Sequence, residues 1–165
     1  SGTCVACVME GTRPILAEVQ ALVAKSGFGT PRRQTTGFDY NRMALLLAVL
    51  EKRGGFFFSS LDAYVNVVGG LRLDEPAADL PVALALVSNL LDKPVPDDVA
   101  AFGEVGLAGE VRSVSAIQQR VSEAYRLGFT TCVVPRHCLG QIDTRGMPAL
   151  NLVVACSLSQ AVAAL

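Results

Sequence analysis

The sequence predicts a mixed α/β domain in which helices cover a sheet. Short runs rich in Val and Ala end in turn residues, as strands do, and longer runs repeat apolar residues at helical spacing. The apolar half of the chain is mostly Ala, Val and Leu, with 6% aromatic residues and no Trp, which is typical of helices packed on sheets. A length of 165 residues favours one domain over residues 1–165, in which Ser1 and Gly2 are compatible with a remnant of tag removal.

The chain is predicted to begin with a hairpin. Residues 3–11 and 14–24 have the composition of strands, and a turn that contains Gly and Pro joins them. A Gly-rich loop with a short strand follows at residues 27–37, and it holds two adjacent arginines, Arg32 and Arg33.

The first helix is predicted over residues 39–55. Asp39 is a good N-cap because its side chain can accept a hydrogen bond from a free backbone N–H, and Gly54 is expected to end the helix. Apolar residues at helical spacing predict its buried face, which consists of Met43, Leu46, Leu47 and Leu50.

An acidic turn leads into the second helix. After a strand at residues 62–70, the segment "RLDEPAAD" opens a helix that runs to about Leu91. The acids of this turn are Asp74, Glu75 and Asp79. Pro76 fits the first helical position, but Pro81 would then lie inside the helix. Either the helix kinks at the second proline or it begins near Asp79.

A third helix is predicted over residues 115–128, after a glycine-centred hairpin at residues 99–114. Ser115 and Gln118 have the spacing of a capping box, and Gly128 is expected to end the helix. Its apolar stripe consists of Ile117, Val121, Ala124 and Tyr125.

Two strands and a short helix complete the predicted order. Residues 130–135 and 151–156 predict strands on either side of a polar loop, and residues 157–165 predict the last helix. The result is a mixed sheet with covering helices.

The charge balance does not by itself indicate a nucleic-acid binder, because the net charge is −1. Eleven of the fourteen basic residues are Arg, which suits bidentate contacts to phosphate or carboxylate, although a composition bias explains the excess equally well. Charged residues make up 18% of the chain, below the average of roughly 25%. Burial against partners and an Ala/Val-rich genome explain this low fraction equally well.

The cysteines do not predict a metal site. Cys4 and Cys7 lie three residues apart on a predicted strand, so their side chains should point to opposite faces and not to one ion. We therefore expect no metal, interpret the cysteines as buried apolar residues and place His137 at the surface. An odd number of cysteines without a signal peptide predicts a reduced, cytoplasmic protein, and no apolar run approaches the roughly 18 residues that cross a membrane.

Common catalytic and nucleotide-binding motifs are absent. The chain has no Gly-x-Ser-x-Gly elbow and no Walker A motif, since "GGLRLDEP" lacks the Lys-Ser/Thr ending. We therefore expect no cofactor in this chain.

Three stretches resemble the proteolytic domain of Lon-type peptidases. In that family a turn "KDGPSAG" opens one helix, and a hairpin "TGEITLRGQV" precedes a helix that begins "GGLKEK". The corresponding stretches here are "LDEPAAD", "FGEVGLAGEV" and "SAIQQR". The resemblance implies a Lon proteolytic-domain-like fold. It also implies a Ser-Lys dyad, in which the Ser of "PSAG" attacks and the last Lys of "GGLKEK" is its base.

Both dyad positions carry other residues here. The Ser position is Ala77 and the Lys position is Arg120. Alanine has no nucleophile, and arginine stays protonated in proteins, so we expect no catalytic residue at this site. The stem of Arg120 can pack beside the apolar stripe of its helix, and its head is expected to pair with one of the three acids of the turn.

Longer blocks resemble a narrower family. The segments "MEGTRPILAEVQALV", "YVNVVGGLRLDEPAADLPVALAL" and "FGEVGLAGEVR" are similar to the C-terminal Lon-like domain of the bacterial RadA family, also called Sms. That resemblance implies a role in DNA repair and recombination, in which branched DNA intermediates are processed. It also implies a hexameric ring, and a zinc finger and a RecA-like ATPase domain outside this chain that would hold zinc and ATP.

The resemblance implies a non-catalytic scaffold. The domain would form a ring with copies of itself, contact the ATPase domain and help to hold single-stranded or branched DNA, without a membrane. The arginines that could contact phosphates, with the adjacent pair first, are Arg32, Arg33, Arg13, Arg42, Arg126 and Arg136. For any single one, a solvated charge or a salt bridge between subunits is the alternative.

Two other functions stay open. One is an oligomerisation module that makes no DNA contact. The other is a peptidase with a relocated nucleophile at Ser88, Ser113 or Ser115. Ser113 and Ser115 are better explained as helix caps and Ser88 as a residue on a helix face, and no lysine lies near the motif.

Overall fold

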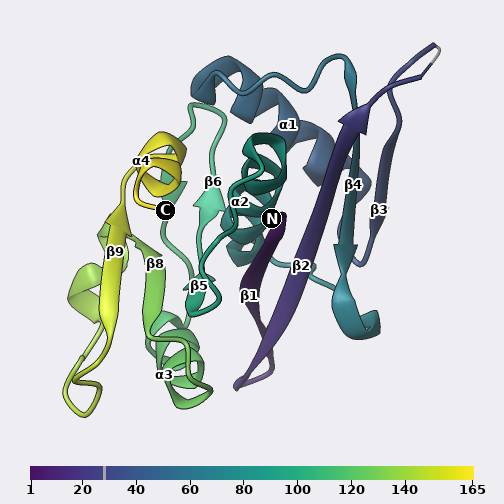
Figure 1. Ribbon diagram of the computed structural model, residues 1–165. Coiled ribbons are helices and arrows are strands. Elements are labelled where there is room, and N and C mark those ends of the chain that lie inside the picture. The colour runs from purple at the N-terminus through teal and green to yellow at the C-terminus, as the bar shows by residue number, and fades with distance from the viewer. Residues whose placement is uncertain (28) are drawn as a thin grey trace.

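The structure, a computed structural model, describes residues 1–27 and 29–165 (Figure 1). Phe28, in the predicted Gly-rich loop, lies outside the described residues. The strands are β1 (Thr3–Glu10), β2 (Arg13–Lys25), β3 (Arg33–Thr36), β4 (Leu61–Val67), β5 (Val99–Ala101), β6 (Glu104–Val105), β7 (Val111–Arg112), β8 (Thr131–Pro135) and β9 (Asn151–Ala155). The helices are α1 (Tyr40–Gly54), α2 (Asp79–Leu91), α3 (Ile117–Arg126) and α4 (Leu158–Ala163), with 3₁₀ turns at Val68–Gly70, Pro76–Ala78 and Arg136–Gln141.

One large mixed sheet forms the central layer. Its strands follow the order β3-β4-β2-β1-β5-β8-β9, and β6 and β7 form a separate small hairpin. The pairs β1/β2 and β2/β4 are antiparallel, whereas β3/β4, β1/β5, β5/β8 and β8/β9 are parallel. The predicted fold class, a mixed sheet with covering helices, is therefore confirmed. Of the hairpin predicted at residues 99–114, β5 instead joins the main sheet.

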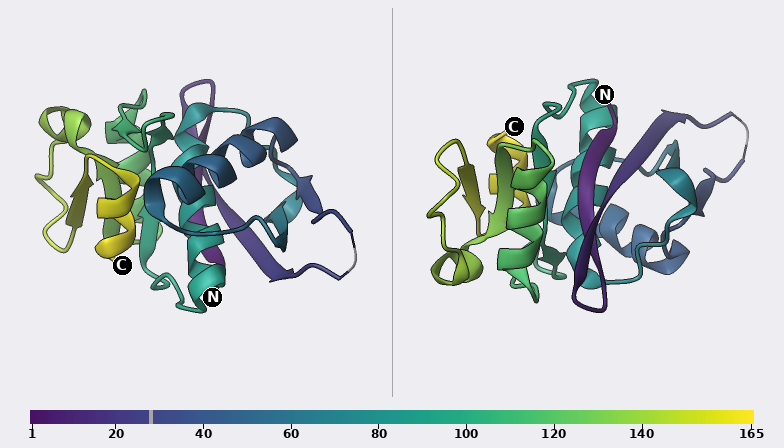
Figure 2. Two further views of the ribbon diagram at one scale, coloured as in Figure 1. Left: turned by 90° about the horizontal axis from the view of Figure 1, so that it is seen from above. Right: turned by 90° about the horizontal axis from the view of Figure 1, so that it is seen from below.

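The helices lie on both faces of the sheet (Figure 2). α1, α2 and α4 cover one face and form the larger hydrophobic core with β1, β2 and β4. α3 covers the other face and packs on β1, β5 and β8 in a second core. α2 is buried on nearly every side because it lies between the sheet and the helices α1 and α4. No helix in the described part of the chain is long and apolar enough to cross a membrane.

The first helix forms largely as its sequence predicts. The Asp39 side chain accepts a hydrogen bond from the backbone N–H of Arg42, and the four predicted apolar residues are buried. The residue that adopts the left-handed conformation at the C-terminus is Gly55, with φ 75°, and Gly54 is the last helical residue.

The second helix begins at Asp79, the later of the two predicted starts. Pro76 opens a 3₁₀ turn that ends at Ala78, and α2 continues from it. Pro81 is the third residue of α2. It causes no break there, because the first N–H groups of a helix have no intrahelical acceptor.

The predicted capping box at the start of the third helix is wrong. The N-cap of α3 is Ala116, which has φ 55° and makes no side-chain cap hydrogen bond. The backbone carbonyl of Ser115 instead accepts a hydrogen bond from the Arg120 side chain, and the Gln118 side chain bonds to Ser122 and Asp143. The Gln118 side chain is therefore engaged within α3 and with the loop before β9, and not with Ser115.

Candidate functional site

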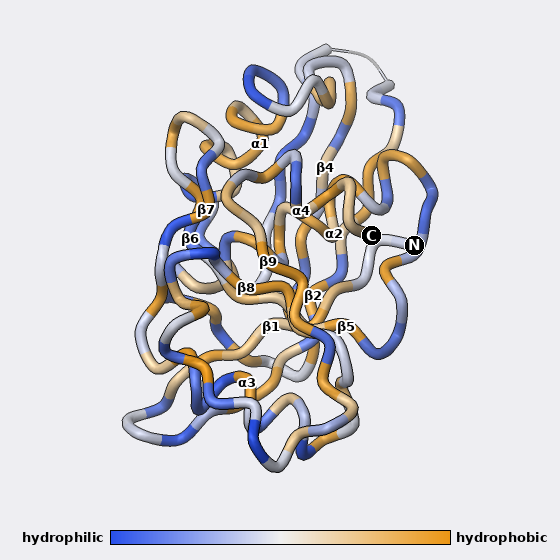
Figure 3. The backbone as a smooth tube through the Cα atoms, turned by 90° about the vertical axis from the view of Figure 1, so that its left-hand side faces the viewer, coloured by the Kyte–Doolittle hydropathy of each residue, from blue (hydrophilic) through white to orange (hydrophobic). Residues whose placement is uncertain are grey.

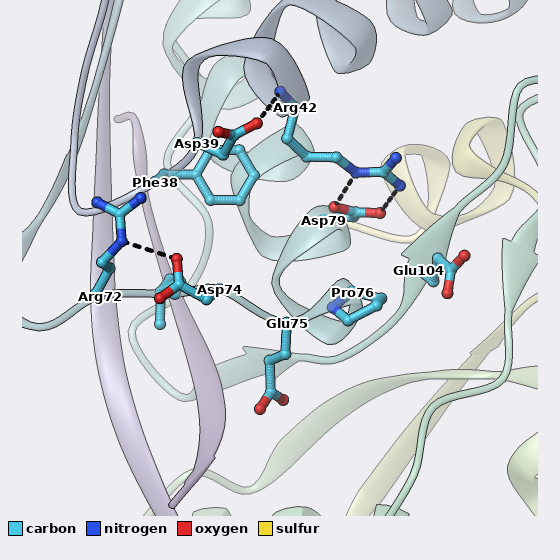
Figure 4. Close-up of a pocket in the computed structure, with 10 residues that line it drawn as sticks. Phe38, Asp39, Arg42, Arg72, Asp74, Glu75, Pro76, Asp79 and Glu104 are labelled. Carbon is cyan, nitrogen blue, oxygen red and sulfur yellow. Dashed lines mark hydrogen bonds and ion pairs between the residues drawn. The ribbon is translucent and has the colours of Figure 1, made fainter.

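The turn before α2 carries three acidic residues, and each is paired with a different arginine. The pairs are Arg72 with Asp74, Arg120 with Glu75, and Arg42 with Asp79. Figure 4 shows the first and the last of these pairs around the turn. The three arginines come from the segment after β4, from α3 and from α1. The turn is thus tied to three separate parts of the fold.

Arg120 of α3 connects its own helix to the turn and to β1. Its side chain is only 2% exposed, and its Nη1 donates to a carboxylate oxygen of Glu75 and, at 2.6 Å, to the carbonyl oxygen of Cys7. Its Nε donates to the carbonyl oxygen of Ser115 at 2.8 Å. The other carboxylate oxygen of Glu75 accepts the backbone N–H of Met9 at 3.0 Å. One guanidinium therefore connects α3, β1 and the turn.

Arg42 and Asp79 form the second buried connection. The Asp79 carboxylate is 1% exposed and binds Nε of Arg42 at 2.8 Å and its Nη2 through the second oxygen. The same carboxylate accepts the backbone N–H of Val105, and Arg42 Nη2 donates to the Val105 carbonyl, both at 3.0 Å. The hydrogen bonds that Arg42 donates to the Asp79 carboxylate raise the pKa of Arg42, and partial burial opposes this shift. This pair links α1, α2 and the β6–β7 hairpin.

Two cavities adjoin the turn. The larger one, of about 430 Å³, is lined by all three acids of the turn together with Arg42 and Arg72 (Figure 4). The smaller one, of about 150 Å³, is lined by Ala77 and Arg120 among others. The fold therefore brings Ala77 and Arg120, 43 positions apart in the sequence, to one small cavity.

The smaller cavity has little chemical capacity. Ala77 contributes a methyl group, and its backbone carbonyl accepts the N–H of Gly103 at 3.1 Å. Arg120 is occupied by Glu75 and by two backbone carbonyls. Ser113 and Ser115 also line this cavity, and both are exposed. A serine needs a base to become a nucleophile, and the protonated guanidinium beside these residues cannot act as one.

The arginines proposed for DNA contact lie in different environments. Arg13, Arg32 and Arg136 are exposed. Two others are partly buried and bind protein acceptors. Arg42 is held by the buried Asp79. Arg33 points inward and donates to the carbonyls of Leu61 and Phe58, because it lies on the covered side of β3. Both guanidinium groups thus already bind acceptors within the protein, and a DNA contact by either of them stays a prediction.

Two further arginines lie near α3. Arg126 is paired with Glu123 through Nε and Nη2. Arg145, in the loop before β9, was not among the sequence candidates, and it is the most exposed of the ion-paired arginines at 91%. The polar composition of "QIDTRG" was the only sequence signal for it.

The cysteines lie in the two cores. Cys4 packs in the core under α1 and α2, and Cys7 in the core under α3, as strand alternation predicts. Burial raises the pKa of Cys4 to about 12 and that of Cys132 to about 12. Burial is also the main cause that raises the pKa of Cys7 to about 11. No group of three His, Cys, Asp or Glu residues within residues 1–27 and 29–165 could hold a metal ion, and His137 is exposed.

Comparison with known proteins identifies the family. The family profile described as "Lon protease (S16) C-terminal proteolytic domain" matches residues 50–152, which include both Ala77 and Arg120. The chain is 47% identical over 163 residues to the DNA repair protein RadA of Streptococcus pyogenes serotype M3, covering 98% of this chain and 36% of that protein. It is 52% identical over 139 residues to RadA of Streptococcus pneumoniae, covering 84% of this chain and 33% of the relative.

A third relative, RadA of Bacillus subtilis, is 51% identical over 135 residues, which cover 82% of this chain and 30% of that protein. The chain thus spans about a third of the length of the curated relatives it matches. The chain therefore belongs to the Lon protease C-terminal proteolytic domain family, and within it the chain resembles the Lon-like domain of RadA proteins.

Proposed function

We propose that this chain is a non-catalytic Lon-like domain of a RadA-type DNA repair and recombination protein. Its role is to hold copies of the protein together in a ring, a hexamer by family resemblance, and to help hold single-stranded or branched DNA. The partners are further copies of the chain, the DNA and a RecA-like ATPase domain of the same protein. ATP and zinc belong to other domains, and the protein acts in the cytoplasm.

The observation that carries this proposal is the state of the cavity shared by Ala77 and Arg120. By family resemblance these residues stand at the Ser and Lys positions of the peptidase dyad. A methyl group cannot attack a peptide bond, and an arginine fixed by a carboxylate cannot accept a proton. The ion pair with Glu75 gives Arg120 a structural role in place of a catalytic one.

Two observations support assembly and DNA repair. The relatives that match most of this chain are named DNA repair proteins. Phe57 and Leu107 are large apolar side chains that are exposed, the first after α1 and the second in the β6–β7 hairpin. Arg53 of α1 donates to the carbonyl oxygen of Leu107, so the hairpin lies against the end of that helix. A contiguous apolar patch marks a protein contact surface, and we propose these two side chains as members of such a patch.

The relocated-nucleophile alternative has little support. The Ser88 hydroxyl donates to the carbonyl of Lys93 at 2.5 Å and accepts the backbone N–H of Gly2 at 2.9 Å, which is a structural role at the far end of α2. The exposed Ser113 and Ser115 lie beside Arg120, which cannot serve as a base. An oligomerisation module without DNA contact remains the second candidate, since the exposed apolar residues support both functions.

The test compares a full-length protein that contains this domain with a form from which the domain, residues 1–165, has been removed. We expect removal of the domain to weaken DNA binding, to lower DNA-stimulated ATPase activity and to reduce the assembly size in light scattering. Unchanged DNA binding with a smaller assembly would favour the oligomerisation module. Cleavage of casein that is lost on changing one serine to Ala would support a peptidase and overturn the proposal.

A further inference from the structure

A shallow hollow with polar and apolar lining lies beside α3, away from the turn before α2. Its volume is about 540 Å³, and its lining includes Gln118, Ser122, Tyr125 and Arg126 of α3 together with Asp143 and Arg145 of the loop before β9. Figure 1 places α3, the β1–β2 turn and this loop at the same end of the molecule, and Figure 3 shows hydrophilic and hydrophobic stretches alternating there.

The loop that forms one wall of the hollow is fixed to the helix. The Gln118 side chain accepts the backbone N–H of Asp143 at 2.6 Å and donates to its carbonyl at 3.3 Å. Gln118 also donates to the hydroxyl of Ser122 at 2.9 Å. The backbone of Ala149, further along the loop, donates to the Tyr125 hydroxyl at 3.4 Å. The distance between the two walls is therefore set by the fold.

An arginine on each wall is oriented by a neighbouring carboxylate. Arg126 donates to Glu123 from Nε at 2.8 Å and from Nη2 at 2.7 Å. Arg145 donates to Asp143 from Nε at 3.0 Å and from Nη2 at 2.7 Å. Each guanidinium has five N–H groups, so each keeps donors for a further anion. At 67% and 91% exposure, both side chains are open to a ligand.

A third arginine extends this surface. The pKa of Glu123 is lowered, first by the hydrogen bonds from Arg126 and its charge, and then by the positive charge of Arg13. Arg13 begins β2 and is exposed, and the β1–β2 turn before it lies at the same end of the molecule as α3 (Figure 1). Glu123 and Asp143 offset the charges of Arg126 and Arg145, so an anion would be held by the guanidinium N–H groups that these acids leave free.

We propose that this hollow binds backbone phosphates of a DNA strand, with Arg126 and Arg145 as the donors on its two walls. Gln118 and Ser122 supply neutral hydrogen-bonding groups between them, and these residue types are common phosphate and sugar ligands. Arg13 contacts the strand as it leaves the hollow. This inference rests on the proposed DNA-binding function and assigns that function to a surface.

The test is DNA binding by the full protein, measured by fluorescence anisotropy over a range of salt concentrations with a labelled single-stranded oligonucleotide and a duplex of equal length. The test variant is Arg126→Ala/Arg145→Ala. Its matched control is Lys93→Ala/Arg112→Ala, which removes two exposed positive charges from other parts of the surface. Arg112 is ion-paired with Glu110, so the control also breaks one exposed ion pair.

We expect the test variant to lose about tenfold or more in affinity, because hydrogen bonds between charged groups are broken. The slope of log affinity against log salt should decrease by about 1.4 for the single strand and by about 1.8 for the duplex, which corresponds to two lost phosphate contacts. The control should change neither quantity to that extent. Arg126→Lys/Arg145→Lys should retain much of the salt slope, since the positive charges remain.

The test variant and the control could show equal affinity and an equal salt slope although the protein binds DNA through this domain. That result would overturn this site and leave the proposed function standing. Equal DNA binding with and without the domain would overturn both. Competition by poly-glutamate as strong as that by DNA would make the hollow a general anion site and overturn its assignment to DNA.

Discussion

Arg120 of α3 and Glu75 of the turn before α2 form an ion pair in which the arginine is almost fully buried. Glu75 neutralises the charge of Arg120, and the carbonyls of Cys7 and Ser115 accept further N–H groups of its guanidinium. A buried charge is tolerated only when it is paired and hydrogen-bonded in this way. The residue at the base position of the peptidase dyad is thus part of the structural core.

Arg120→Met should destabilise the domain by about 3 kcal/mol, because it leaves Glu75 and two carbonyl groups without their donor. The side chain of Glu75 is 21% exposed, so water can solvate it in part and the loss should lie at the low end of the usual range. The measurement is the free energy of unfolding in urea. Arg72→Met is the control, since the exposed pair with Asp74 should contribute less than about 1 kcal/mol. Similar losses in the two variants would contradict the structural role of Arg120.

Ala116→Gly should stabilise the domain by about 1 kcal/mol. Ala116 has φ 55° and ψ 36°, the left-handed conformation, which is strained for a residue with a Cβ atom and favourable for glycine. The change should appear as a higher urea midpoint with the same slope. Ala108→Gly is the control, because Ala108 is exposed and is not among the residues with positive φ, so glycine there should give no gain. A loss of stability in Ala116→Gly would show that the Cβ atom contributes packing that outweighs the strain.

Local signals account for the elements that the sequence predicts well. The N-cap Asp39, the apolar face and the terminal glycines of α1 all lie within one short segment, so its bounds follow from the sequence. At the start of α3 the Gln118 side chain bonds to Ser122 and to the backbone of Asp143 in a later loop, and the spacing of a capping box cannot reveal these partners. The place of β1 beside β5 likewise depends on contacts between residues far apart in the chain.

In the candidate site, too, some contacts could be predicted from the sequence and others could not. The pairing of Arg120 with an acid of the turn could be predicted, because the family resemblance already brought the two segments together. The partner of Arg42 could not be predicted, since Asp79 lies 37 positions away and nothing local marks Arg42 as inward-facing. The position of Arg145 beside α3 could not be predicted, because it depends on a loop that Gln118 holds against this helix.

The stability of the domain should fall as the pH rises above about 9. Burial raises the pKa of the Cys7 thiol from 9.0 to about 11 and that of Cys132 to about 12. Below pH 9 these thiols are protonated in both states, so the full stability is present. Above pH 9 the thiols of the unfolded chain lose their protons before those of the folded domain. This difference favours unfolding more and more until the pH passes the pKa of the thiols in the folded state. Urea unfolding at pH 8.0 and at about pH 10.5 measures this change.

The control for this pH dependence is Cys132→Ala. It should show a weaker fall of stability between the two pH values, because one raised thiol is absent. Labelling with a thiol reagent near neutral pH gives an independent measurement, in which Cys156 should react first because the other four cysteines are buried. An equal pH dependence in Cys132→Ala would mean that groups other than this thiol cause the effect.

Restoring the dyad residues alone should fail to restore peptidase activity. In Ala77→Ser the new hydroxyl would lie in the cavity with Arg120, which cannot take its proton. In Ala77→Ser/Arg120→Lys the new ammonium would stand beside Glu75, and that carboxylate would hold the lysine protonated by raising its pKa. Neither variant should cleave fluorescent casein or react with a serine-directed phosphonate.

The informative comparison is the triple variant that also carries Glu75→Gln, in which the lysine loses its counter-charge and its pKa should fall. Phosphonate labelling that appears only in the triple variant would identify Glu75 as the residue that keeps this site inactive. Labelling of the double variant would contradict that assignment.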